Sequence, residues 1–85
     1  MRGYVYILTN ERLNVMYTGS TGELKNRIYQ HKNQLIDGFT KKYNVTRLVY
    51  FEEFLSIEEA ALRERQIKGY SRAKKNALVI KINET

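Results

Sequence analysis

The chain begins with two strand-like segments that carry tyrosines and run directly into a helix-like segment. Residues 3–9 are rich in aromatic and β-branched side chains, residues 10–14 form a polar turn, and residues 15–20 are typical of a partner strand. After a break at residues 21–22, apolar side chains recur with helical spacing over residues 24–36. Because the connection is so short, this helix must pack on the hairpin, which constrains how the fold can start.

The middle of the chain predicts a loop followed by a third strand. Gly38 is expected to end the first helix as a left-handed cap. Residues 39–45 follow as a basic loop. Residues 47–54 are strongly apolar, which predicts a strand that is central in the sheet or buried on both faces.

The last third of the chain carries signals for two further helices. Ser56 and Glu59 form a capping box, which predicts that the second helix begins at Ile57. Gly69 is expected to end that helix, and Ser71 can cap a third one. The tail of the third helix, residues 78–82, could instead form a strand.

Composition bounds the class of protein. With 85 residues, the chain is expected to form one small domain that spans residues 1–85. The absence of cysteine excludes disulfides, thiolate zinc sites and thiol nucleophiles. The apolar runs are too short to cross a bilayer and no signal peptide is visible, so we expect a cytoplasmic protein with no membrane partner. The element order β-β-α-β-α-α predicts an α+β fold with a small sheet covered by helices.

The charge pattern points to a polyanionic partner. The formal net charge is +6, and two basic blocks, residues 25–47 and 61–85, flank an acidic segment at residues 48–60. Excess positive charge on a small domain suggests nucleic acid, although a solvated charged surface explains the charge alone equally well.

Tyrosines and a glycine make the predicted hairpin a candidate site. Side chains alternate along a strand, so Tyr4 and Tyr6 share one face, and Tyr17 shares a face with Gly19. A glycine inside a strand often marks close approach by a ligand or another backbone, so these tyrosines could line a concave site. Each tyrosine taken alone is better explained as a half-buried sheet residue.

Arg27 and His31 are the chemically distinctive residues of the first helix. They are neighbours on one surface of it, with His31 inside the apolar stripe and Arg27 at its edge. A buried histidine is more often a hydrogen-bonded core residue, and such an arginine is more often a snorkelling surface residue. Because the stripe must pack on the sheet, both are expected near Tyr17, where the planar guanidinium could bind two phosphate oxygens.

Glu64 is the sharpest anomaly, because it falls in the middle of the apolar stripe of the second helix. Glutamate is rarely buried without a partner. An ion pair with Lys68 is one explanation, but such a pair contributes only about 0.3–0.5 kcal/mol, against a desolvation cost of several kcal/mol. A hydrated metal or a cleft would resolve the conflict, and a lone carboxylate suits Mg²⁺ or Mn²⁺ far better than zinc.

Other basic and small residues are candidates for substrate binding. Residues 40–43 and 71–75 have the character of contacts to backbone phosphates, although a solvated charged face explains them equally well. No Walker loop, dinucleotide fingerprint or zinc spacing is present. The substrate-binding candidates are Gly19, Lys41, Lys42, Tyr43, Lys68, Arg72, Lys74 and Lys75.

Taken together, these segments resemble the GIY-YIG endonuclease superfamily, and most closely its small single-domain bacterial members. Residues 4–6 are similar to the GIY element and residues 17–19 to the YIG element. The other similar segments are residues 27–31, 39–43, 48–52, 64–68 and 71–75, so the resemblance covers essentially the whole chain. Tyr4 stands where GIY has glycine and Thr18 where YIG has isoleucine, and we expect neither position to carry chemistry.

The resemblance implies a three-stranded antiparallel sheet flanked by helices, and metal-dependent hydrolysis of DNA phosphodiesters, with repair or recombination as the expected setting. The positions it implies for the catalytic site are Tyr6, Tyr17, Arg27, His31 and Glu64. Members often carry an asparagine near the end of the domain, for which Asn76 and Asn83 are candidates. Larger relatives have a separate DNA-binding domain, so a partner protein could supply specificity here.

The working hypothesis gives each residue a role. Glu64 holds one metal ion against the phosphate, and Arg27 adds a second positive charge. Tyr17 takes the proton from the attacking water, His31 relays that proton or hydrogen-bonds the phenol, and Tyr6 positions phosphate or water. Two alternatives stay open: a DNA- or RNA-binding module without catalysis on the same fold, and an adaptor whose basic face docks an acidic protein.

Overall fold

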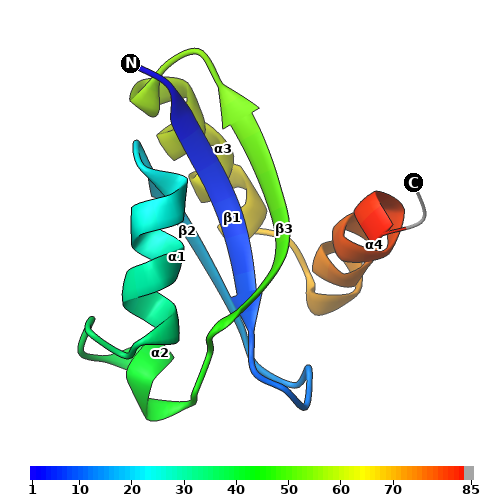
Figure 1. Cartoon of the computed structure of the whole chain (residues 1–85). Coiled ribbons are helices and arrows are strands. Elements are labelled where there is room, and N and C mark those ends of the chain that lie inside the picture. The colour runs from blue at the N-terminus through cyan, green and yellow to red at the C-terminus, as the bar shows by residue number, and fades with distance from the viewer. Residues whose placement is uncertain (84–85) are drawn as a thin grey trace.

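A three-stranded antiparallel sheet organises the molecule (Figure 1). The computed structural model describes the backbone of residues 1–83 and the side chains of residues 1–80. Strand β1 (Gly3–Thr9) lies in the centre, between β2 (Met16–Thr21) and β3 (Arg47–Phe54), and pairs antiparallel with both. The expected α+β fold with this sheet is therefore confirmed.

Helices cover both faces of the sheet. Helix α1 (Leu24–Lys32) packs on one face, and α3 (Ile57–Lys68) packs on the other, against β1 and β2 (Figure 1). Helix α4 (Arg72–Asn83) lies beside β3, and α2 (Phe39–Lys42) is a single turn between α1 and β3. The sheet is thus the middle layer, and the side chains of β1 contribute to two separate cores, one on each face.

Alternation along β1 explains the two cores. Val5 and Ile7 are fully buried with Ile67 of α3, whereas Tyr6 and Leu8 are buried on the opposite face. The prediction that residues 47–54 are central is wrong, because β3 is an edge strand whose side chains are only half-buried or exposed. Its apolar residues reflect partial cover on each face rather than full burial.

The caps predicted for α3 and α4 are present. The Ser56 hydroxyl accepts a hydrogen bond from the Glu59 amide at 3.2 Å, and the Ser71 hydroxyl accepts one from the Lys74 amide at 3.2 Å. Gly69 directly follows the end of α3. The alternative of a strand at residues 78–82 is wrong, since α4 continues through them as a helix.

Helix α1 ends earlier than its periodicity predicts. Gln34 adopts a left-handed conformation with φ 55°, and its amide donates to the His31 carbonyl at 3.1 Å. The Leu35 amide returns to the Gln30 carbonyl at 2.8 Å, which completes a Schellman motif. Gly38, with φ 107°, therefore precedes α2 instead of capping α1, and Leu35 is 63% exposed. The predicted stop signal failed because a glutamine, not a glycine, occupies the left-handed position.

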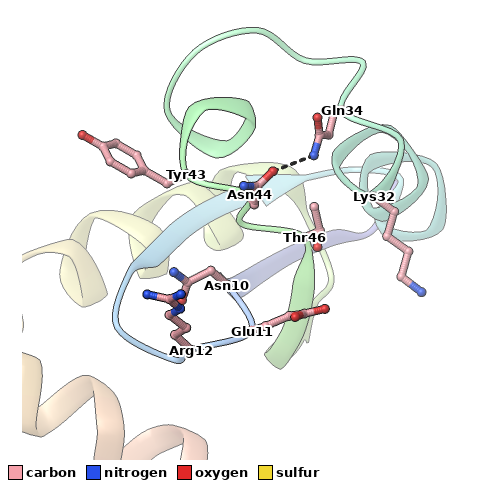
Figure 2. Close-up of a pocket in the computed structure, with 8 residues that line it drawn as sticks. All are labelled: Asn10, Glu11, Arg12, Lys32, Gln34, Tyr43, Asn44 and Thr46. Atoms are coloured by element: carbon pink, nitrogen blue, oxygen red, sulfur yellow. Dashed lines mark hydrogen bonds between the residues drawn. The ribbon is translucent and has the colours of Figure 1, made fainter.

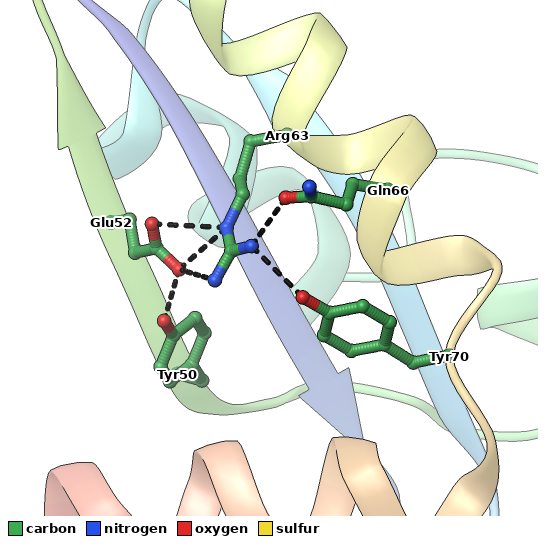
Figure 3. Close-up of polar contacts among 5 residues, drawn as sticks. All are labelled: Tyr50, Glu52, Arg63, Gln66 and Tyr70. Atoms are coloured by element: carbon green, nitrogen blue, oxygen red, sulfur yellow. Dashed lines mark hydrogen bonds and ion pairs between the residues drawn. The ribbon is translucent and has the colours of Figure 1, made fainter.

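A polar network fastens α3 to β3 (Figure 3). Arg63 of α3 forms an ion pair with Glu52 of β3 at 3.1 Å, and both side chains are only about a quarter exposed. Arg63 also donates to the Tyr70 hydroxyl at 3.1 Å and to Gln66 at 2.5 Å, while the Tyr50 hydroxyl donates to Glu52. Burial, followed by the hydrogen bond to Glu52, raises the pKa of Tyr50 to about 12. The network ties α3 and the segment that follows it to the sheet.

Candidate active site

Two phenols and an imidazole form a compact cluster between the sheet and α1. The ring centroid of Tyr17 lies 6.3 Å from that of Tyr6 and 5.6 Å from that of His31. The Tyr6 hydroxyl is 3.2 Å from His31 Nε2, and His31 Nδ1 is 3.2 Å from the Thr40 hydroxyl. The structure therefore brings Tyr6, Tyr17 and His31 together on the face that α1 covers.

Gly19 makes this cluster possible. A Cβ atom at position 19 would lie 2.6 Å from the Tyr6 hydroxyl and 3.0 Å from the Tyr17 ring. The group that closely approaches this glycine is thus a pair of phenols of the protein itself, and not the ligand or backbone that a strand glycine led us to expect. A contact of Gly19 with substrate stays a prediction.

The electrostatics of the cluster hold its two buried members neutral. Burial raises the pKa of Tyr6 above its ordinary value, Tyr17 adds to the rise, and the Arg27 charge opposes it. Burial, followed by the Arg27 charge, lowers the pKa of His31. At neutral pH Tyr6 therefore keeps its proton and can donate to Nε2 of a neutral His31, whose Nδ1–H then faces the Thr40 hydroxyl.

Arg27 is coupled to the same cluster. Its charge affects the pKa of both Tyr6 and His31, which requires the guanidinium to lie close to them. The side chain extends from α1 and is half-buried. The guanidinium therefore offers positive charge to the Tyr6–His31 pair.

Glu64 reaches the sheet from the opposite face, on α3. Its Oε1 accepts a hydrogen bond from the Ser20 hydroxyl at 2.5 Å, and its Oε2 lies 2.5 Å from Lys68 Nζ. Burial would raise the pKa of the Glu64 carboxyl, but the hydrogen bonds from Lys68 and Ser20 outweigh burial and lower it. The carboxylate is therefore ionised, and the ion pair with Lys68 that the spacing allowed is formed.

The two halves of the candidate site meet across the edge strand β2. Gly19 and Ser20 are adjacent, so their side-chain positions point to opposite faces of the sheet. One position receives the Tyr6 hydroxyl and the other the Glu64 carboxylate. Charges act between the two faces across this strand. Glu64 adds to the rise in the pKa of Tyr6, which is due mainly to burial. Glu64 raises the pKa of Lys68, and Tyr17 adds a smaller rise.

Three polar residues of this region were missed in the sequence. Ser20 holds Glu64, Thr40 holds His31, and Thr18 carries a buried hydroxyl. The alternation of β2 does place Ser20 and Thr18 on the face opposite Tyr17, which is a usable signal once α3 is assigned to that face. Thr40 was grouped with surface phosphate contacts, but its side chain is buried and serves His31.

The candidate substrate-binding residues are dispersed. Lys41 pairs with Asp37 at 3.3 Å, and Lys42 lies 5.4 Å from the centroid of the Tyr43 ring. Tyr43 belongs to a polar pocket of about 440 Å³ between the β1–β2 turn and the segments flanking α2 (Figure 2). There the Gln34 amide donates to Asn44 at 2.9 Å, and the Tyr43 ring points away from this pair (Figure 2).

The basic residues of α4 have different surroundings. Arg72 donates to the carbonyls of Leu13 at 2.9 Å and Asn14 at 3.2 Å, which ties α4 to the β1–β2 turn. Lys74 lies 4.1 Å from the centroid of the Tyr70 ring. Lys75 lines a cavity together with Tyr17 and Lys68, beside the candidate site. Substrate binding by these residues stays a prediction.

The structure describes the surroundings of only one of the two candidate asparagines. Asn76 lines a cavity with Thr9, Met16 and Val49 near the far end of β2. The side chain of Asn83 lies outside the described residues. The role of a C-terminal asparagine therefore has no support from geometry.

The chemistry of the Glu64 site fits a single divalent cation. Among the residues that the structure describes, no three His, Asp or Glu side chains gather around one point. Glu64 is ionised, and each of its oxygens keeps acceptor capacity after the bonds to Ser20 and Lys68. One carboxylate is what Mg²⁺ commonly takes from a protein when water and phosphate supply its other ligands.

Comparison with known proteins identifies the family. The model of the GIY-YIG catalytic domain matches residues 2–76. The chain belongs to the GIY-YIG family. This membership places it among nucleases that act on nucleic acid. Over the described residues, no helix of this GIY-YIG protein is long and apolar enough to cross a membrane.

Several small relatives share nearly the whole GIY-YIG chain. The chain is 40% identical over 76 residues to a UPF0213 protein of Clostridium perfringens, covering 89% of this chain and 81% of that protein. It is 37% identical to a UPF0213 protein of Staphylococcus saprophyticus, covering 89% and 92%. A solution NMR structure of a UPF0213 protein from Bacillus halodurans is 38% identical, with a TM-score of 0.57, covering 93% of this chain and 83% of that chain.

Proposed function

We propose that this protein is a divalent-metal-dependent endonuclease that hydrolyses phosphodiester bonds of DNA. The observation that supports the proposal is that the Glu64 carboxylate bonds to Ser20 while the Tyr6 hydroxyl packs against the adjacent Gly19, on the other face of β2. Membership of the GIY-YIG family supports the same reaction. A structure-selective role in repair or recombination is part of the proposal.

Glu64 is the proposed metal ligand, with Mg²⁺ or Mn²⁺ as the ion. When bound, the ion would neutralise charge on the phosphate and polarise it. Ser20 and Lys68 orient the carboxylate from either side. Lys68 also lies near Tyr17, so its ammonium can contact a phosphate oxygen without leaving Glu64.

Arg27 stabilises negative charge on the phosphate oxygens, since its planar guanidinium can bind two of them. Tyr17, which is half-buried at the cavity shared with Lys68, takes the proton from the attacking water. Tyr6 is a poor base because burial raises its pKa. Its single proton goes to His31 Nε2, so its oxygen can position a water by accepting a hydrogen bond. Neutral His31 holds the Tyr6 hydroxyl in place at 3.2 Å.

A second candidate is a nucleic-acid-binding module without catalysis. The observation in its favour is that Glu64 already has two close partners, as a purely structural carboxylate would. Such a module would bind DNA or RNA through its basic residues in a salt-sensitive manner and without any need for metal.

Nicking of supercoiled plasmid in the presence of Mg²⁺ tests the proposal. Glu64→Gln and Arg27→Ala should each lower the nicking rate by about 10² or more, because each removes charge stabilisation at the phosphate. The matched controls are Glu58→Gln and Arg65→Ala, which make the same charge changes at exposed positions of α3. Equal nicking by all four variants would exclude the roles assigned to Glu64 and Arg27. Metal-independent binding of DNA without nicking would establish the second candidate.

A further inference from the structure

The hydroxyl of Thr18 is buried, and the described part of the chain offers it no partner. Thr18 lies in β2 between Tyr17 and Gly19, its exposed fraction is 4%, and its Oγ1 has no hydrogen-bond partner among the described residues. Leaving such a group unpaired costs about 1–3 kcal/mol, so buried hydroxyls in native proteins almost always have a partner. The missing partner therefore points to a ligand.

The surroundings of Thr18 define the chemistry of that ligand. Thr18 lines a cavity of about 240 Å³, on the β2 edge of the sheet. The other lining residues are Met16, Tyr17, Phe39, Lys68 and Lys75. The ammonium groups of Lys68 and Lys75, together with the buried, unpartnered hydroxyl of Thr18, favour an anion with several acceptor oxygens, and a phosphate group has them. A carboxylate or metal ion would satisfy fewer of these donors.

The aromatic wall of the cavity favours a nucleotide over a free anion. The rings of Tyr17 and Phe39 are stacked, with centroids 6.3 Å apart and an interplanar angle of 30°. Phe39 is 47% exposed and its ring also contacts Tyr43, with a centroid distance of 5.0 Å. Exposed aromatic faces beside a basic pocket are a common platform for unpaired bases.

We propose that this cavity binds a phosphate of the substrate strand next to the one that is cut, with Thr18 Oγ1 donating to it and Lys68 and Lys75 neutralising it. The proposal rests on the proposed function, because it treats the cavity as part of the nucleic-acid path past Tyr17. Thr18 is then a specificity-determining residue, and Phe39 stacks on the attached base.

A metal-free NMR titration with thymidine 5′-monophosphate tests the site apart from cleavage. In the parent protein, saturable shifts should occur at Thr18, Phe39 and Lys75, and thymidine without phosphate should give none. Thr18→Val should weaken binding about tenfold, as expected for losing one hydrogen bond to a charged group. Thr18→Ser should retain it, and Lys75→Gln should weaken it. Thr46→Val and Lys32→Gln are matched controls outside the cavity and should bind like the parent.

Chemical denaturation of Thr18→Val supplies a second readout, the free energy of unfolding. This quantity should stay equal or rise while nucleotide binding weakens. If Thr18 has no partner inside the protein, the valine removes an unsatisfied group and the variant should be as stable as the parent or more stable. Lower stability would show that the hydroxyl is bonded internally, and would overturn the proposal. Equal binding of the nucleotide by Thr18→Val and the parent, or no binding by the parent, would overturn it too.

The two proposals fail in different ways. If the nucleotide binds through Thr18 but Glu64→Gln nicks plasmid as fast as the parent, the nuclease assignment is wrong and the phosphate site stands. If nicking depends on Glu64 but Thr18→Val binds nucleotide like the parent, only the phosphate site is wrong.

Discussion

Gly19 controls the geometry of the phenol cluster at the scale of single residues. The Tyr6 ring crosses β2 where a side chain would otherwise stand, and this crossing sets the hydroxyl 3.2 Å from His31. The glycine is therefore required for close packing rather than for an unusual backbone angle. Its neighbours are the buried Tyr6 ring and the half-buried Tyr17 ring, which are packed together and cannot move aside cheaply.

Gly19→Ala should lower the free energy of unfolding by about 1–3 kcal/mol, because the new methyl group collides with two rings. Gly69→Ala is the matched control, since its Cβ would meet nothing closer than 3.4 Å, at the Gln66 carbonyl. Urea denaturation compares both variants with the parent. Equal midpoints for the parent and Gly19→Ala would show that the rings do not occupy this space.

His31 should make stability depend on pH. Its pKa is lowered in the folded protein from 6.5, so the unfolded chain binds a proton first as the pH falls. Stability is therefore complete above about pH 6.5 and is lost as the pH drops from there toward the folded pKa. Denaturation midpoints measured from about pH 7.5 to 5.5 should fall for the parent, and should fall less for His31→Gln. Parallel curves would contradict a neutral, buried imidazole.

The sequence predicted some of these residue contacts and not others. Helical spacing and a short loop were enough to bring His31 to Tyr17, because both are local constraints. The contacts of Ser20 with Glu64 and of Thr40 with His31 depend on how separate elements dock. A single serine or threonine has no sequence pattern that predicts such a contact. The Lys68 pair with Glu64 was visible because it lies within one helix.

At the scale of elements, α3 is held by two adjacent residues that reach different strands. Arg63 binds Glu52 of β3, and Glu64 binds Ser20 of β2 (Figure 3 shows the first of these contacts). The helix therefore cannot rotate about its axis without breaking one contact. The network around Arg63 thus helps to hold the Glu64 carboxylate at the edge of the sheet.

Arg63→Met should lower the free energy of unfolding by about 1–3 kcal/mol, because it leaves Glu52 half-buried without its cation. Arg2→Met is the control, since it breaks an exposed ion pair with Glu53, which should be worth about 0–1 kcal/mol. Thermal or urea denaturation measures both. An effect of Arg63→Met no larger than that of Arg2→Met would show that the network adds no stability.

Element bounds followed from sequence where local chemistry decides them. The residue range of β1, the Ser56 cap and the end of α3 match the predictions, because strand composition and capping residues act locally. The centre of the sheet was misassigned because apolar content does not reveal pairing order. The end of α1 was misassigned because Gln34 takes a conformation that usually marks glycine.

At the scale of the whole molecule, the layered architecture explains why the candidate site lies at β2. Helices cover both faces of the sheet, so groups from the two faces can meet only around an edge strand. The side of β3 is closed off by α4 and the Arg63 network, whereas β2 carries Tyr17, Thr18 and Ser20. The net charge of +6 adds long-range attraction for nucleic acid.

Binding of a DNA oligonucleotide without metal should weaken linearly with salt on a log–log plot, as expected for counterion release. Lys75→Gln should reduce the magnitude of that slope by about 1, since it removes one phosphate contact. Lys32→Gln, which lies at the pocket of Figure 2, should leave the slope unchanged. Fluorescence anisotropy across a salt series gives the slopes, and identical values for both variants would remove Lys75 from the interface.

A crystal soaked with Mn²⁺ and a DNA oligonucleotide carrying a non-cleavable phosphorothioate tests the central claim most directly. The claim is that Glu64 and the phenols, from opposite faces of the sheet, share one phosphate. The predicted result is anomalous density bound to a Glu64 oxygen, with the same phosphate in reach of Arg27 and the Tyr17 hydroxyl. DNA bound on another face, or a phosphate at the phenols with no ion at Glu64, would contradict the claim.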